Sequence, residues 1–270
     1  AMVSRRDYKV TGLDCAEEVA ILRREVGGLY GVIDLEFLRA AITPQTALIS
    51  IMHANNEIGT IQPIETVVSM AREHGVPVHS DAVQSFGKAG LDVRKLGVDF
   101  LSVSAHKIYG PKGIGALYIR KGTDICPFIH GGRQERGFRA GTENTIGITG
   151  FGEAARLLLE RSSQDRERIE RLADLLKKGI EEQIPKVRFN GHPEKRVKNT
   201  LSVVFPGLEA EAILLALATK GISVSPGSAC SSEAEEVSSV LLAIGLRPEI
   251  ARSCIRISLG RFNTEEDVQE

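Results

Sequence analysis

Short apolar runs alternate with a helical pattern between Thr46 and Ser104, and this alternation constrains the fold more than any other feature of the sequence. A short apolar run bounded by turn residues is typical of a buried strand. Three such strands are predicted: Thr46–Met52, Val76–Asp81 and Phe100–Val103. The pattern of Ile64–His74 predicts a helix between the first two strands. Because strands that alternate with helices build βαβ units, the sequence predicts an α/β fold with a parallel sheet.

Polar side chains follow the second and third predicted strands. Asp81 ends the second strand, and the third is followed by Ser104-Ala105-His106-Lys107. Open α/β sheets bind their ligands at the carboxyl ends of the strands. A lysine amine can attack a carbonyl carbon there, and a carboxylate can pair with the pyridinium nitrogen of pyridoxal phosphate. Taken alone, Lys107 would be better explained as an exposed loop lysine, since most lysines are exposed, but the two motifs together indicate a cofactor site.

Five motifs occur in order along the chain: HANNEIGTIQP (His53–Pro63), HSDAVQS (His79–Ser85), SAHKIYGPKG (Ser104–Gly113), RAGTEN (Arg139–Asn144) and GSACSS (Gly227–Ser232). Together, from about Gly31 to the end of the chain, the sequence closely resembles the cysteine desulfurases of the class V aminotransferase family. These enzymes use pyridoxal phosphate and supply sulfur for iron–sulfur clusters. The resemblance implies a PLP-dependent transferase fold of the aspartate aminotransferase type. It would have a mostly parallel sheet in an incomplete large domain and a smaller C-terminal α+β domain.

The resemblance assigns the cofactor pyridoxal 5′-phosphate to seven positions: Asn56, Asp81, Gln84, Ser104, His106, Lys107 and Thr142. Asp81 would keep the pyridine nitrogen protonated, which makes the ring an electron sink. Asn56 and Gln84 would contact the ring oxygen. Thr142 would reach the phosphate of the cofactor in a partner subunit, which implies a homodimer.

Three residues would be catalytic: Lys107, His106 and Cys230. Lys107 would bind the cofactor covalently and then move protons at the substrate α-carbon. His106 and Ser104 would bind the cofactor phosphate. Cys230 would attack the sulfur of L-cysteine, which leaves a persulfide on Cys230 and releases L-alanine. Free cysteines are mostly buried and inert, but a cysteine flanked by small residues in a polar loop is expected to be exposed and therefore reactive.

Arg256 and Asn56 would bind the carboxylate of the substrate, since the guanidinium offers a planar fork of donors. Without the resemblance, a salt bridge to a local acid would explain Arg256 equally well. Cys126 and Cys254 belong to no motif and are expected to be buried or neutral.

Composition limits the other partners of the chain. Its 270 residues carry a formal net charge of −1, which argues against a nucleic-acid-binding surface. No apolar run is long enough to span a membrane. The four cysteines are widely spaced without a C-x-x-C pair, so neither a structural zinc site nor a disulfide framework is predicted, and a reducing cytoplasmic compartment fits best. The resemblance adds an iron–sulfur scaffold protein as the acceptor of the sulfur.

Three segments are expected: 1–30, 31–163 and 164–270. The first resembles the start of a heavy-metal-associated domain, although Glu18 stands where such domains carry the second cysteine of a C-x-x-C pair, and Asp14, Cys15 and Glu18 could still form a weak zinc site. The second would be part of a PLP-binding large domain, and the third a small domain with the reactive cysteine loop. The phosphate-binding turn and the ring-stacking histidine of the family are not found between Ala1 and Gln45. The resemblance therefore does not include the N-terminal third of the family's sequence.

Further elements are predicted from periodicity. Helices are expected over Gly31–Ile42, Thr145–Leu159, Gln164–Ile184, Glu209–Lys220 and Val237–Ile244. Strands are expected over Thr200–Val204, Ile222–Val224 and Ile255–Leu259.

Two other functions remain open on the sequence alone. The chain could be an inactive desulfurase-like scaffold or a metal-binding protein that uses Cys15. It could also be a selenocysteine lyase, which belongs to the same aminotransferase-like class. The motif GSACSS, which contains Cys230, favours the desulfurase.

Overall fold

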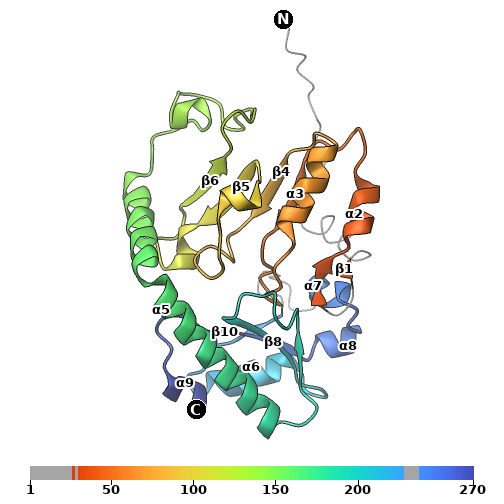
Figure 1. Cartoon of the computed structure of the whole chain (residues 1–270). Coiled ribbons are helices and arrows are strands. Elements are labelled where there is room, and N and C mark those ends of the chain that lie inside the picture. The colour runs from red at the N-terminus through yellow and green to blue at the C-terminus, as the bar shows by residue number, and fades with distance from the viewer. Residues whose placement is uncertain (1–25, 28–29, 228–236) are drawn as a thin grey trace, which may run out of the picture.

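A computed structural model describes residues 26–27, 30–227 and 237–270. Its first sheet contains four strands in the order β3-β4-β5-β6: Ile49–Met52, Val78–Asp81, Phe100–Ser104 and Gly115–Ile119. The first three strands run parallel, and β6 pairs antiparallel with β5. The predicted α/β fold with a mostly parallel sheet is therefore confirmed (Figure 1).

Helix α3 (Ile64–Glu73) connects β3 to β4 and packs on the first sheet. Its buried positions recur at helical spacing: Ile64, Val67, Val68, Met70 and Ala71. They belong to one apolar cluster with Ile49, Val78 and Leu101 of the three parallel strands. Since burying a side chain of this size contributes about 1.5–3 kcal/mol, this cluster holds the strands and the helix together.

The carboxyl ends of the parallel strands lie side by side. The amide of His53, which follows β3, donates to the carbonyl oxygen of Asp81 at 2.8 Å. The amide of Ala82 donates to the carbonyl oxygen of Ser102 in β5 at 2.9 Å. A short 3-10 helix, η2 (Ala105–Ile108), begins directly after β5. The polar residues that follow the predicted strands therefore share one edge of the sheet.

The second sheet contains strands in the order β7-β8-β10-β9: Arg188–Asn190, Thr200–Val204, Cys254–Ser258 and Ser225–Pro226. Neighbouring strands in this sheet are all antiparallel. Its helices are short: α6 (Ala210–Ala218), α7 (Ser239–Ala243), α8 (Pro248–Ala251) and α9 (Glu265–Gln269). The strand predicted over Ile222–Val224 is wrong by a few residues. The amide of Ile222 still bonds to the Leu217 carbonyl of α6, so the chain pairs with β10 only from Ser225.

The two sheets are connected by α5 (Thr145–Gln183), a single helix of 39 residues. The expectation of two helices, Thr145–Leu159 and Gln164–Ile184, is wrong. Residues 160–163 contain neither glycine nor proline, so nothing interrupts the helical hydrogen bonds between them. The helix contacts η2 beside the first sheet and β8 and α9 beside the second (Figure 1). The predicted domain boundary after residue 163 falls inside this helix, and the division into domains remains a prediction.

The helix predicted over Gly31–Ile42 is shorter than expected. A strand, β2 (Val32–Ile33), pairs with β1 (Val26–Gly27) before α2 (Leu35–Ala41) begins. Asp34 explains the boundary, because its carboxylate accepts two backbone amides of the first turn at 2.9 and 3.0 Å and so caps the helix.

The loop after β3 ties the two halves of the structure together. Thr60 is fully buried, and its hydroxyl donates to the carbonyl oxygen of Tyr30 at 2.6 Å and accepts the amide of His192 at 3.0 Å. The amide of Val197 donates to the carbonyl oxygen of Gly59 at 2.9 Å. Residues that are far apart in sequence are therefore held at fixed positions around this loop.

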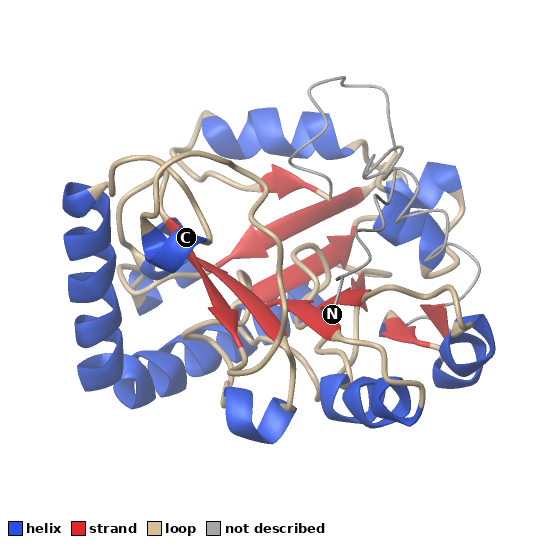
Figure 2. Cartoon of the chain, turned by 90° about the horizontal axis from the view of Figure 1, so that it is seen from above, coloured by secondary structure: helices blue, strands red, loops and turns tan. Residues whose placement is uncertain are grey.

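Figure 2 shows helices placed around the outside of the molecule with the strands towards its middle. Within the described part of the chain, no helix combines the length and the apolar character that crossing a membrane requires.

Ligands of open α/β sheets bind at the carboxyl ends of the strands, so the predicted site is expected at the carboxyl ends of β3, β4 and β5.

Candidate active site

Asp81 is the last residue of β4 and is half-buried. The amide of Val83 donates to one of its carboxylate oxygens at 2.8 Å, which fixes the carboxylate at the sheet edge. The chain then turns, since the amide of Phe86 donates to the carbonyl oxygen of Ala82 at 2.8 Å, and Gln84 lies within this turn. A fixed carboxylate at a strand end is the arrangement that suits a pyridinium nitrogen.

The helix η2 places His106 and Lys107 directly beyond β5. Ser104 Oγ and His106 Nδ1 are 2.7 Å apart and share a hydrogen bond. His106 is exposed, whereas Lys107 is half-buried. Tyr109 closes the turn with a φ of 67°, and its hydroxyl accepts the amide of Arg261 at 2.7 Å. The position of Lys107 is thus fixed from both the first sheet and the segment after β10.

Lys88 brings a second lysine near Lys107, and reasoning from the sequence missed it. Its Nζ donates to Gln84 Oε1 at 3.3 Å. Burial, helped by the positive charges of Lys107 and Arg256, lowers the pKa of Lys88 to about 8. Three cationic groups therefore act on one region, which favours a ligand with negative charge. The spacing of four residues between Gln84 and Lys88 is the signal that could have found it.

Arg256 and Asn56 meet although 200 residues separate them. Arg256 lies on β10 of the second sheet, and its Nη1 donates to the carbonyl oxygen of Asn56 at 3.1 Å. Both residues are half-buried. Among the described residues Arg256 takes part in none of the ion pairs, so the local salt bridge that would have explained it is not formed there.

Glu57 follows Asn56 and is a buried acid that reasoning from the sequence also missed. Only 7% of its surface is exposed, and its Oε2 accepts the hydroxyl of Ser238. Burial raises the pKa of Glu57 to about 7, although the Ser238 hydrogen bond and the charge of Arg256 act in the opposite direction. Its signal in the sequence is an acid inside the motif HANNEIGTIQP, directly after the assigned residue Asn56.

The raised pKa of Glu57 predicts a pH dependence of stability. The folded chain holds the Glu57 proton up to about pH 7, whereas the unfolded chain releases it near pH 4.5, so the free energy of unfolding should fall as the pH rises through this window. The fall due to Glu57 is about 3 kcal/mol, and Glu57→Gln should lack it. Denaturant unfolding of both proteins across this window measures the difference, in which the other titrating groups cancel. Parallel curves for the two proteins would contradict this prediction, and Glu211→Gln, at an exposed position in the first turn of α6, is the control.

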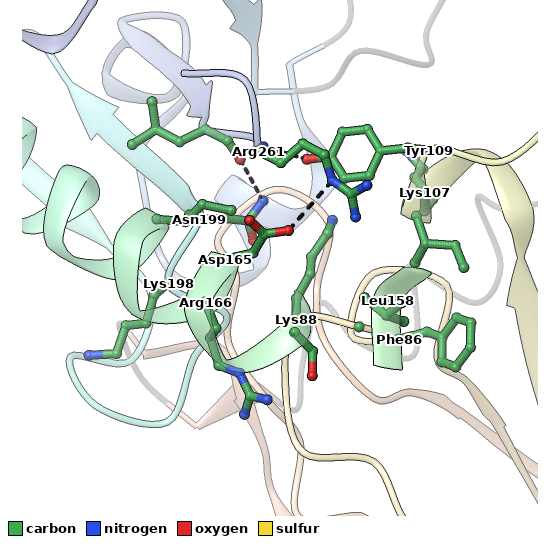
Figure 3. Close-up of a pocket in the computed structure, with 15 residues that line it drawn as sticks. Phe86, Lys88, Lys107, Tyr109, Leu158, Asp165, Arg166, Lys198, Asn199 and Arg261 are labelled. Carbon is green, nitrogen blue, oxygen red and sulfur yellow. Dashed lines mark hydrogen bonds and ion pairs between the residues drawn. The ribbon is translucent and has the colours of Figure 1, made fainter. Parts of the chain in front are cut away.

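A cavity of about 60 Å³ lies beside Lys107, between η2, α5 and the segment after β10. Figure 3 shows Lys88 and Asp165 pointing into it, and Asp165 pairs with Arg261 at 3.6 Å. This volume holds a few water molecules and no larger ligand. Neither Asp81 nor the Ser104–His106 pair lines the cavity, so it adjoins the predicted cofactor site without being that site.

Two predicted site residues remain, Thr142 and Cys230. Thr142 is exposed in the loop before α5. Cys230, like Cys15, lies outside the described residues. Of the other cysteines, Cys126 is exposed, and burial raises the pKa of Cys254 to about 11, so that thiol is unreactive. Across residues 26–27, 30–227 and 237–270, no three His, Cys, Asp or Glu side chains gather closely enough to hold a metal ion.

The cofactor implied by the resemblance can be compared with the groups present. The sheet edge offers one oriented carboxylate, one half-buried lysine, and a hydroxyl paired with an imidazole. A pyridinium nitrogen, an aldehyde and a phosphate require these three kinds of group. The donor set formed by Asp81, Lys107, Ser104 and His106 therefore fits pyridoxal phosphate.

Comparison with known proteins gives consistent results. The family model of the aminotransferase class-V proteins matches residues 22–270. Cysteine desulfurase IscS of Clostridium botulinum is 45% identical over 268 residues, which cover 98% of this chain and 64% of that protein. A solved structure described as a NifS-like protein is 41% identical with a TM-score of 0.81, covering 90% of this chain and 63% of the other. The structure of SspA in complex with cysteine is 37% identical with a TM-score of 0.73, covering 88% and 66%.

The chain thus spans less than two thirds of the length of the curated relative that it matches. The match of the family model extends over both sheets and the helix that connects them. They include the edge where Asp81 and Lys107 lie.

Proposed function

We propose, from the premise that this chain belongs to the aminotransferase class-V family, that it is a cysteine desulfurase dependent on pyridoxal 5′-phosphate. The observation that carries the proposal is the placement of Asp81 and Lys107 at the carboxyl ends of adjacent parallel strands. This placement provides an acid for the pyridinium nitrogen and an amine for the aldehyde in one site.

Each residue of the sheet edge would bind a different part of the cofactor. Lys107 would hold it covalently, and Asp81 would keep its ring nitrogen protonated. The Ser104–His106 pair would donate to the phosphate. Lys88 accounts for the orientation of Gln84, because an amide oxygen that accepts from an amine leaves the amide NH₂ to donate to the ring oxygen. When bound, the cofactor would stabilise the negative charge that develops at the substrate α-carbon.

The Asn56–Arg256 pair would bind the carboxylate of L-cysteine, because it offers a guanidinium that forms no ion pair within the described part of the chain. A structure of the relative SspA in complex with cysteine supports this class of substrate. Lys107 would remove the proton at the α-carbon and later return one. The thiolate of Cys230 would attack the substrate sulfur, so that a sulfur–sulfur bond forms while the carbon–sulfur bond breaks. The carbon that loses sulfur takes a proton, which gives L-alanine.

Three further assignments belong to the same proposal. Thr142, exposed before α5, would reach the cofactor of a second copy of the chain in a homodimer. An iron–sulfur scaffold protein would accept the sulfur from Cys230. The chain would act in the cytoplasm. A selenocysteine lyase or an inactive scaffold is less well supported, since the curated relatives matched are cysteine desulfurases.

Trapping of the cofactor tests the proposal. The chain is mixed with pyridoxal 5′-phosphate, reduced with borohydride and digested, and the modified peptide is identified by mass spectrometry. We expect the reduced cofactor on Lys107, because it is the lysine at the edge that carries Asp81. Modification of Lys88 in place of Lys107, or of surface lysines without preference, would contradict the assignment.

A further inference from the structure

Glu57 lies in an environment that disfavours its charge. It belongs to the loop between β3 and α3, and it sits beside the apolar cluster formed by Ile58, Val204, Leu241, Ile244, Ala251 and Cys254. A carboxylate in such surroundings is costly unless it is hydrogen-bonded, and an apolar residue would pack there at lower cost. Packing alone therefore does not explain a hydrogen-bond acceptor at this position.

The hydrogen bond from Ser238 explains why an acceptor is present at this position. The Ser238 hydroxyl donates to Glu57 Oε2, and the Ser238 oxygen accepts the amide of Leu241 at 3.2 Å, which caps α7. A Cβ added to Gly227 would stand 3.6 Å from Glu57 Oε2, so the backbone of Gly227 also lies close to the carboxylate. Glu57 thus lies beside Gly227, which directly follows β9, and bonds to Ser238 at the start of α7. Glu57 and Ser238 are 181 residues apart in the sequence.

The backbone of Glu57 is fixed as firmly as its side chain. Asn55 Oδ1 accepts the amides of Glu57 and Ile58 at 2.8 and 3.0 Å, which forms a tight turn. Asn56 lies inside this turn, and its carbonyl oxygen accepts Nη1 of Arg256. The turn is therefore bonded to the second half of the structure at two adjacent residues, Asn56 through Arg256 and Glu57 through Ser238.

We propose that Glu57 is a positioning residue: by accepting the Ser238 hydroxyl it holds the Asn55–Glu57 turn in place, and so sets the Asn56–Arg256 pair to select ligands that carry a carboxylate. This inference rests on the proposed function, because the ligand is the amino acid bound at the cofactor. Glu57 itself does not touch the ligand. It acts through the two residues that do.

Binding of L-alanine and of ethylamine tests the proposal. Ethylamine is L-alanine with the carboxylate replaced by hydrogen, and each amine shifts the absorbance of the bound cofactor when it displaces Lys107. The ratio of their dissociation constants therefore measures carboxylate selectivity without any turnover. The wild-type chain should bind L-alanine more tightly, and Glu57→Ala should reduce this ratio by up to about tenfold, the size expected when one hydrogen bond is lost.

Two variants separate positioning from general loss of structure. Glu57→Gln keeps an oxygen that accepts the Ser238 hydroxyl, so it should restore the ratio to within about twofold of the wild type. Glu65→Ala removes an exposed acid of α3 and should change nothing. If Glu57→Ala weakens both amines equally, or if Glu57→Gln behaves like Glu57→Ala, the positioning role is overturned. If the wild type itself shows no preference for L-alanine, the proposed function fails, and this inference fails with it.

Discussion

Replacing Lys107 with alanine is expected to abolish covalent capture of pyridoxal phosphate and to slow the release of L-alanine from L-cysteine by at least about a thousandfold. Lys107 is the amine placed beyond β5, at the same edge as the fixed carboxylate of Asp81. The neighbouring amine of Lys88 is held by its hydrogen bond to Gln84, so we expect it not to replace the amine of Lys107. Absorbance spectra with added cofactor and an assay of L-alanine measure the two effects.

The matched control for this variant is Lys112→Ala. Lys112 is an exposed lysine in the turn that follows η2, five residues from Lys107. Its removal changes the net charge by the same amount and should leave the absorbance and the rate as they are. An absorbance band that survives in Lys107→Ala and disappears in Lys112→Ala would show that the cofactor is bound through Lys112, and would contradict a cofactor site at the sheet edge.

The second large effect is expected for Cys230→Ala. This variant should still capture the cofactor, because none of the groups that would bind it is changed. It should form no persulfide, because the thiolate that accepts the sulfur is absent. Mass spectrometry of the intact chain after one exposure to L-cysteine should show an added sulfur atom on the wild type and none on the variant.

Cys126→Ala is the control for that experiment, since Cys126 is an exposed thiol without a neighbouring motif. It should gain sulfur as the wild type does. Cys254 is a poor alternative acceptor, because burial raises the pKa of its thiol to about 11. A persulfide that forms in Cys230→Ala and is lost in Cys126→Ala would show that Cys126 is the reactive thiol and would contradict the assignment of Cys230.

Local patterns predicted the first sheet well, for a physical reason. The apolar runs that end at Asp81 and at Ser104 are short and bounded by polar residues, and α3 shows helical spacing that ends before Gly75. These features depend on neighbours in the sequence. The edge that carries Asp81 and Lys107 followed from them, because parallel strands place their carboxyl ends together.

The parts that sequence reasoning missed depend on distant contacts. Lys88 is notable only because the fold buries it near Lys107 and Arg256, and Glu57 only because Ser238 comes to lie beside it. No periodicity encodes such contacts. The continuity of α5 was missed for a different reason, since its charged middle shows no apolar stripe to follow. The roles of Thr142 and Cys230 remain predictions.

The most direct test of the central claim is the stoichiometry of one reaction. The chain is loaded with pyridoxal 5′-phosphate and given L-cysteine, and L-alanine and protein-bound sulfur are counted in the first turnover. A cysteine desulfurase with the residues assigned above should release one L-alanine for each sulfur atom gained by the chain. A chain that binds the cofactor on Lys107 and takes up L-cysteine yet releases no L-alanine would contradict the account.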